Sequence, residues 1–207
     1  GYTKVICNAT IENTVPRFLK GKNMGWVTAE YGMLPRSTNE RMRRESKVKQ
    51  SGRTKEIQRL IGRSLRSSVN LNKLGDRAIT IDCDVIHADG GTRTASLSGG
   101  FVALCLALRS QDSEEFSSAD VIKSFTGSVS IGKVNGEIIL ELDYEEDANA
   151  ETDMNLIMNE EGNVIEIQGT AEDGDFSLEE LNEMVILAEN GMKKIIDIQR
   201  KARNNYE

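Results

Sequence analysis

The sequence of 207 residues is short of several residue types, and these shortages exclude some classes of protein. It contains three cysteines, an odd number, and Cys7, Cys83 and Cys105 lack the spacing of a metal site. We therefore expect reduced core cysteines in an intracellular protein, without a disulfide framework. No apolar run approaches the roughly 20 residues that cross a bilayer, and no signal peptide is visible. The sequence predicts a soluble, cytoplasmic protein that does not contact a membrane.

Histidine is also scarce, and the commonest nucleotide-binding motif is missing. His87 is the single histidine, and we favour a structural role for it over a role as a catalytic base. The neighbouring stretch Gly90-Gly-Thr-Arg-Thr94 is no P-loop, because the Gly-Lys-Ser/Thr ending is absent. The nucleotide-binding function of a P-loop is therefore excluded.

What this stretch does contain is a glycine turn that opens directly into a strongly apolar segment. Before the turn, residues 78–86 alternate apolar and polar side chains, which predicts a strand. After it, residues 95–108 are too densely apolar for a surface helix, so we expect a buried helix. The free N–H groups at the start of that helix, with Thr92 and Arg93, would form an anion site. A plain strand-to-helix turn, in which glycine supplies an unusual φ angle, fits the same residues.

The length of the chain allows one sizeable core. We expect a single domain over residues 1–207, organised as a phosphate-binding half, residues 1–125, and an acidic, metal-binding half, residues 126–207. Residues 2–10 are typical of a strand that is already under way. We therefore expect the opening strand of the domain to lie before residue 1.

The net charge of −7 hides a strong asymmetry along the chain. Residues 36–66 hold eleven Lys and Arg against three Asp and Glu, whereas residues 111–190 hold two against twenty-two. One basic segment on an acidic protein favours a localised contact with a polyanion such as RNA. A solvated charged surface is the alternative interpretation. The basic and aromatic loop of residues 17–26 has the same two interpretations, RNA contact or half-buried packing.

The basic segment cannot bury itself, since residues 37–50 include only two large apolar side chains. We expect an exposed, mobile loop over these residues. Beyond it, the apolar spacing predicts a helix from residue 51 to about residue 70, with Arg53 at its entrance. An anion would be favoured at that position.

The acidic half contains two predicted hairpins and a helix. Strands over residues 127–134 and 137–144 would turn about Asn135-Gly136, and strands over residues 155–158 and 164–168 about Glu161-Gly162. Between the hairpins, residues 143–155 are rich in Asp, Glu and Asn without a Lys or Arg. Clustered carboxylates suit Mg²⁺, although an acidic surface loop has the same composition. A capping box at Ser177 starts the last helix, which Gly191 is expected to interrupt.

Several segments together resemble the ribonuclease PH family. They include Gly52-Arg-Thr-Lys-Glu-Ile and Glu151-Thr-Asp-Met-Asn155, with residues 16–21, 25–38, 82–96 and 167–171. The resemblance covers nearly the whole chain and keeps the family's order. It implies an α/β fold of βαβα-type units, in which mixed sheets pack against helices. It also implies a phosphate-using 3′→5′ exoribonuclease that trims tRNA precursors, works in reverse as a nucleotidyltransferase and forms a hexameric ring of three dimers.

The resemblance also implies roles for particular residues. Inorganic phosphate, the co-substrate, would bind at Arg53, Gly91, Thr92 and Arg93. Mg²⁺ or Mn²⁺ would bind at Asp147 and Asp153, which would also act as catalytic acids. tRNA would contact Arg36, Arg41, Arg43 and Arg44.

Two other classes of function remain open at this stage. A non-catalytic RNA-binding subunit of an exosome-like ring would share the fold, although such subunits typically lose phosphate-site or acidic residues. A small-metabolite phosphotransferase would use the glycine turn and the acids but would leave the basic segment without a role.

Overall fold

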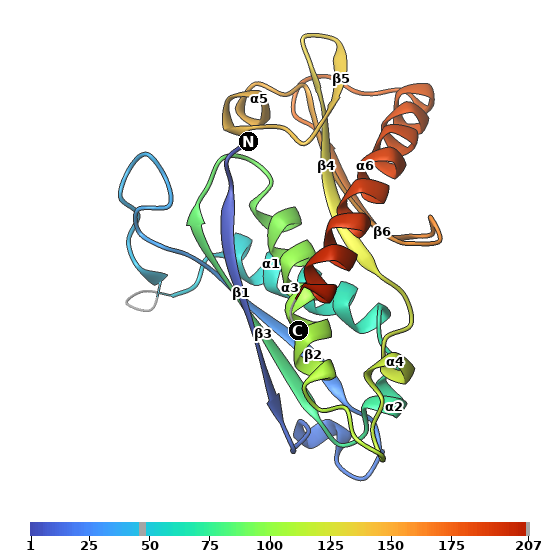
Figure 1. Cartoon of the computed structure of the whole chain (residues 1–207). Coiled ribbons are helices and arrows are strands. Elements are labelled where there is room, and N and C mark those ends of the chain that lie inside the picture. Colours follow the sequence, from blue (N-terminus) through green and yellow to red (C-terminus); the bar gives the residue numbers. More distant parts are fainter. Residues whose placement is uncertain (46–48, 206–207) are drawn as a thin grey trace.

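The computed structural model describes residues 1–45 and 49–205, which form two β-sheets with helices between and beside them (Figure 1). The first sheet has the order β1-β3-β2. In it, β1 (Lys4–Glu12) runs antiparallel to β3 (Ala78–His87), and β2 (Trp26–Met33) runs parallel to β3. A parallel pair needs a crossover connection, which here contains α1 (Gly52–Ser67).

The helix α3 (Thr92–Arg109) lies between the two sheets and carries much of the core. It packs on β1 and β3 on one side and on β4 on the other. Glycine allows the close approach, since a Cβ atom on Gly100 would lie 3.1 Å from Ile81 Cγ2. The predicted buried helix is confirmed: the side chains of Leu97, Phe101 and Leu104 are inaccessible to solvent.

The second sheet is antiparallel throughout, with the order β5-β4-β6-β7. Its strands are β4 (Thr126–Val134), β5 (Glu137–Leu140), β6 (Thr152–Asn159) and β7 (Val164–Ala171). Both predicted hairpin turns are present between these strands. Asn135 and Gly136 have positive φ angles at the first turn, and Gly162 has one at the second.

The last helix, α6 (Leu178–Asn204), covers the second sheet on the side seen in Figure 1. Ser177 caps it with the predicted capping box. Gly191 does not interrupt it, contrary to the expectation. Instead the glycine lets the helix approach β5, because a Cβ atom there would meet Leu140 Cδ2 at 2.5 Å.

One predicted strand is shorter than expected, because a helix takes its end. The strand from residue 137 stops at Leu140, and Asp143 caps α5 (Tyr144–Ala148) by accepting a hydrogen bond from Glu146 N–H. The Glu146 carboxylate accepts one from Asp143 N–H in return. The strand β6 begins earlier than predicted, at Thr152.

Short helical turns complete the α/β fold, whose predicted class is confirmed: a 3₁₀ turn at Arg17–Leu19, α2 (Leu71–Leu74) and α4 (Ser118–Val121). The three cysteines are free, as expected. In the part of the chain that the structure describes, no helix is long and apolar enough to span a bilayer.

Candidate functional site

Two glycines shape the turn between β3 and α3. Gly90 and Gly91 have φ angles of 71° and 54°, in the left-handed region that other residues rarely adopt. A Cβ atom on Gly90 would also collide with the carbonyl oxygen of Leu142. The segment leading into α5 therefore packs directly on the turn that begins α3, and Figure 1 shows α5 beside this end of the helix.

Asp89 fastens the same contact. Its Oδ1 accepts a hydrogen bond of 3.1 Å from the Tyr144 N–H, and its Oδ2 accepts one of 2.7 Å from the Tyr2 N–H. These two backbone donors hold the pKa of the Asp89 carboxyl below its usual value. The start of α5 is thus tied to the glycine turn, which places Asp147, one helical turn further on, across from α3.

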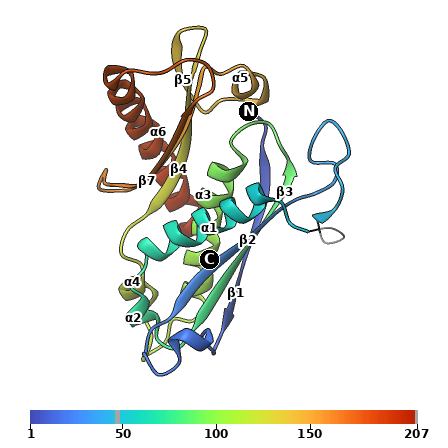
Figure 2. The ribbon, with the colours of Figure 1, turned by 180° about the vertical axis from the view of Figure 1, so that it is seen from behind.

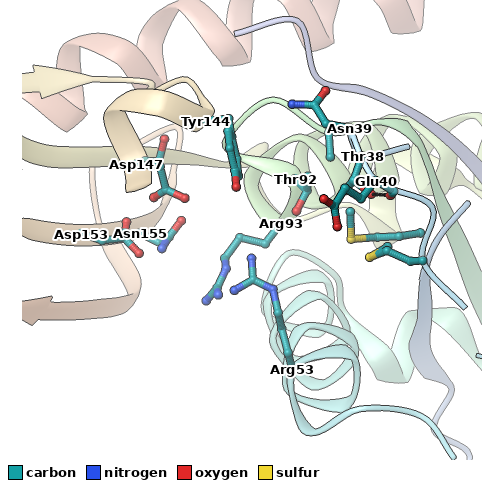
Figure 3. A pocket seen from close by; sticks show the side chains of 16 residues that line it. Thr38, Asn39, Glu40, Arg53, Thr92, Arg93, Tyr144, Asp147, Asp153 and Asn155 are labelled. Carbon is teal, nitrogen blue, oxygen red and sulfur yellow. Dashed lines mark hydrogen bonds between the residues drawn. The ribbon is translucent and has the colours of Figure 1, made fainter. Parts of the chain in front are cut away.

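The N-terminal ends of α1 and α3 face one pocket. Arg53 is the second residue of α1 and Arg93 the second residue of α3, and both side chains point into the same space in Figure 3. Free N–H groups and the helix dipole favour an anion at such ends. The Arg93 Nη1 donates to Gln168 Oε1 at 2.9 Å and lies 3.6 Å from Glu56 Oε2.

A buried tyrosine orients the hydroxyl at the start of α3. The Tyr31 hydroxyl donates to Thr92 Oγ1 at 2.9 Å. Burial raises the pKa of Tyr31, so it remains a donor at neutral pH. Because the Thr92 oxygen accepts this hydrogen bond, its own proton is available for an anion in the pocket.

The opposite wall of the pocket is acidic. Asp147 comes from α5 and Asp153 from β6, and Figure 3 shows both, with Asn155, across from the two arginines. Burial raises the pKa of the Asp153 carboxyl, and the negative charge of Asp147 raises it further. Arg93 and Arg53 act in the opposite direction. Residues that are up to a hundred positions apart in the sequence therefore share one electrostatic environment.

The metal-binding capacity of this wall is limited to a pair of carboxylates. Within residues 1–45 and 49–205, no group of three or more His, Cys, Asp or Glu side chains is arranged to hold a metal ion. A Mg²⁺ ion commonly uses only one or two protein carboxylates, with water and substrate phosphates as its other ligands. Asp147 and Asp153, with the Asn155 amide beside them, fit that donor set.

A cavity of about 560 Å³ joins the two walls. All six residues predicted for phosphate and metal binding line it: Arg53, Gly91, Thr92, Arg93, Asp147 and Asp153. The structure therefore brings the two predicted sites together in one pocket.

The basic residues predicted to bind RNA lie outside the cavity. Arg36, Arg41, Arg43 and Arg44 are exposed, and the segment that carries them projects beside the first sheet in Figures 1 and 2. The exposed, mobile loop predicted over residues 37–50 is anchored at one point, because Ser37 is buried and its carbonyl accepts a hydrogen bond from Ala88 N–H at 2.8 Å. Neighbouring residues of the segment line the pocket: Thr38, Asn39, Glu40 and Met42. Residues 46–48, which include Lys47 of the predicted basic segment, lie outside the described residues.

Sequence reasoning missed other residues that line the pocket. Tyr144 and Asn155 fell inside the acidic stretch but were given no role, and Ser130 gave no sequence signal at all. The Ser130 Oγ is buried without a hydrogen-bond partner in the described part of the structure. Such an orphan hydroxyl beside a helix N-terminus is a candidate anion ligand.

Comparisons with known proteins identify the family of the chain. Residues 1–110 match domain 1 of the 3′ exoribonuclease family, and residues 124–191 match domain 2. The chain is 57% identical over 203 residues to Ribonuclease PH of Neisseria meningitidis serogroup C, across 98% of this chain and 84% of that protein. The serogroup A protein of the same name matches equally well.

Solved structures share the fold at low sequence identity. A chain of the structure titled Archaeal exosome core superposes with a TM-score of 0.72 at 17% identity, covering 97% of this chain and 78% of that one. Rice (Oryza sativa) Rrp46 gives a TM-score of 0.71 at 17% identity, covering 97% and 83% of the two chains.

Proposed function

Because the chain belongs to the 3′ exoribonuclease family, we propose that it is a phosphate-dependent 3′→5′ exoribonuclease that trims tRNA precursors. It releases nucleoside 5′-diphosphates, and the reverse reaction adds nucleotides. The observation that carries this proposal is the joint pocket, in which an anion site on two helix N-termini faces a pair of carboxylates. We propose that residues 1–207 act as one catalytic domain, since both halves supply residues to this pocket.

Inorganic phosphate binds at the glycine turn. The N–H groups at the start of α3, the Thr92 hydroxyl and the guanidinium groups of Arg53 and Arg93 surround it. Gly91 keeps this approach open, because it begins the helix without a side chain. Because both arginines carry a positive charge, phosphate is held electrostatically as well as by hydrogen bonds.

The reaction exchanges one phosphoester bond for a phosphoanhydride bond. An oxygen of the bound phosphate attacks the phosphorus of the last phosphodiester, and the bond from that phosphorus to the 3′-oxygen of the preceding nucleotide breaks. The leaving 3′-oxygen needs a proton, which the protonated member of the Asp147 and Asp153 pair, or a water beside the pair, supplies as general acid. Arg53 and Arg93 stabilise the charge that develops on the transferred group.

The carboxylate pair is the proposed metal site. Asp147 and Asp153 would hold Mg²⁺ or Mn²⁺, since the negative charge of Asp147 raises the pKa of Asp153 and a cation relieves that repulsion. When bound, the ion offsets negative charge on the reacting phosphates.

The RNA approaches over the basic segment. Arg36, Arg41, Arg43 and Arg44 are exposed on the stretch whose other residues line the pocket, so they can contact the RNA backbone while its 3′ end lies inside. A triple variant tests this contact, in which alanine replaces Arg41, Arg43 and Arg44. We expect it to raise the KM for tRNA precursors and to leave the KM for phosphate unchanged.

We propose a hexameric ring of three dimers, which works in the cytoplasm where tRNA precursors are trimmed. The fold shared with a chain of an archaeal exosome core supports assembly into a larger particle. Light scattering would test this, with an expected mass six times that of the 22.9 kDa chain. A monomeric mass at assay concentration would contradict it.

The central experiment uses a tRNA with a short 3′ extension and Mg²⁺, with and without inorganic phosphate. We expect nucleoside diphosphates only when phosphate is present, and an Arg93→Ala protein should release none. Monophosphates released regardless of phosphate would indicate hydrolysis and would overturn the proposed reaction. RNA binding without any released nucleotide would favour a non-catalytic RNA-binding subunit.

A further inference from the structure

A chain of polar contacts links α1, β7 and α3 behind the phosphate site, and the proposed reaction gives it no role. At its centre is Gln168 of β7. Its Oε1 accepts a hydrogen bond of 2.9 Å from Arg93 Nη1. Its Nε2 donates to Glu56 Oε1 at 3.0 Å and to Glu166 Oε1 at 3.1 Å. Glu166 is in turn held by Arg63, through hydrogen bonds of 2.8 and 2.5 Å.

The sheet register places this amide beside the acidic wall. Gln168 pairs with Asn155 of β6, and Asn155 pairs with Ser130 of β4. Directly paired residues direct their side chains to the same face of a sheet. Asp153, two residues before Asn155, shares that face. Gln168 therefore lies where the phosphate-binding helices meet the sheet that carries the acids.

The partners of the amide fix its orientation. Two carboxylates lie on the nitrogen side and a guanidinium on the oxygen side, so a flipped amide would oppose like charges at all three contacts. The oxygen must therefore face Arg93, and the NH₂ group must face Glu56 and Glu166.

The chemistry of an amide at this position has a consequence for charge. Arg93 has to keep its positive charge available to a phosphate, yet the carboxylate of Glu56 is 3.6 Å away from it. Gln168 offers Arg93 a neutral acceptor and simultaneously occupies an oxygen of each carboxylate. In the described structure the other guanidinium nitrogens of Arg93, Nε and Nη2, donate no hydrogen bond to the protein, so they are open to an incoming oxyanion.

We propose that Gln168 is a positioning residue, which holds the Arg93 guanidinium in the phosphate site and keeps it from pairing with Glu56 more closely than the observed 3.6 Å. This inference rests on the proposed function, because it assigns Arg93 to phosphate. It concerns phosphate affinity in particular: Gln168 acts through Arg93 and does not line the cavity.

The test compares three single variants and one double variant. Gln168→Glu keeps the shape and an acceptor but adds a third negative charge beside Arg93. Gln168→Met keeps the approximate volume and removes both hydrogen-bonding groups. Gln111→Glu is the matched control, since it makes the same change at an exposed position after α3. The double variant Glu56→Gln/Gln168→Glu exchanges the amide and the carboxylate.

The readouts are the KM for phosphate, the KM for RNA, kcat, and the affinity for inorganic phosphate by calorimetry without RNA. We expect Gln168→Glu to raise the phosphate KM and dissociation constant by about tenfold or more, because charge-assisted contacts to phosphate are the strong ones. Gln168→Met should raise them about threefold to tenfold. The RNA KM should stay within about twofold in both, and Gln111→Glu should match the wild type in every readout.

Rescue distinguishes positioning from a structural role. The double variant should recover most of the phosphate affinity lost in Gln168→Glu, because the total charge around Arg93 is restored. Wild-type phosphate affinity in both Gln168→Glu and Gln168→Met would overturn the proposal. If the wild type binds phosphate but releases no diphosphates, the proposed function fails, and the calorimetric comparison still decides the role of Gln168.

Discussion

Replacing Gly90 with alanine tests whether the acidic wall of the pocket depends on its contact with the glycine turn. The substitution adds one methyl group at a position with a φ of 71°, directly against the backbone of Leu142 and Asp143. It therefore has two separable costs. One is conformational and local to the turn, and the other is steric and acts on the segment that carries α5.

The structure allows each cost to be given a size. A left-handed conformation costs a residue other than glycine about 1–2 kcal/mol. The collision with Leu142 requires a backbone shift, which adds roughly 1–3 kcal/mol. Gly162 provides the matched control, because it has a φ of 82° with nothing within 4 Å of an added Cβ atom. Gly162→Ala should show only the conformational cost, so Gly90→Ala should be less stable than Gly162→Ala by about the steric amount.

Activity should separate the two variants more strongly than stability does. A displacement of Asp147 by about 1 Å relative to Arg93 is expected to lower kcat by roughly 100-fold. Gly162 lies at the end of β6 remote from Asp153, so Gly162→Ala should keep its kcat. Denaturant unfolding gives the stabilities, and diphosphate release at saturating phosphate gives kcat. If Gly90→Ala unfolds like Gly162→Ala and retains wild-type kcat, the argument that this contact places the acids is refuted.

Three further substitutions have expected outcomes of different sign. Asp89→Asn should destabilise the protein at pH 7, because it removes a hydrogen-bonded carboxylate whose pKa is lowered in the folded state. The loss of stability should persist at pH values above about 3.9, the ordinary pKa of an Asp side chain, and should vanish as the pH falls through the folded-state pKa. Urea unfolding at a series of pH values would show this. Ser130→Ala should raise the phosphate KM by about tenfold. It should leave the stability unchanged or higher by up to about 1 kcal/mol, because it removes a buried hydroxyl without a protein partner. A lower stability with an unchanged KM would contradict the assignment of Ser130 as a phosphate ligand. Tyr31→Phe should cost about 1 kcal/mol of stability and raise the phosphate KM a few-fold, since Thr92 loses its donor; unchanged values in unfolding and kinetics would refute the orienting role.

The periodic parts of the fold followed from local sequence. The alternation in β3 reflects burial of every second side chain, and the dense apolar stretch of α3 reflects burial of the helix. Glycine with a positive φ angle marks the hairpin turns. The sequence analysis missed the helix α5. A signal for it was present, since Asp143 and Glu146 have the spacing of a capping box. The competing hairpin pattern ran through the same residues, and local spacing alone does not decide between them.

The meeting of the two predicted sites depended on tertiary contacts. Nothing in the residues near Gly90 indicates that Leu142 packs against it, and Gln168 reaches Arg93 across 75 positions of sequence. The glycine turn, the helix entrance at Arg53 and the acidic stretch indicated both sites, and the resemblance to a family selected Asp147 and Asp153, whereas side-chain orientation came only from the assembled sheets. This is why Ser130 gave no signal, and why Gln168, although it lies in the segment 167–171, received no role.

The burial of α3 between two sheets has a consequence for the effect of ionic strength. The helix end proposed to bind phosphate carries the buried Thr92 and the half-buried Arg93, where dissolved ions screen charge less than at the exposed Arg41, Arg43 and Arg44. Added salt should therefore weaken the attraction for RNA steeply, through counterion release, and the attraction for phosphate only slightly. The two substrates of one pocket would then respond differently to the same change in salt concentration. Salt alone would change whether RNA binding or the chemical step limits the rate of the enzyme.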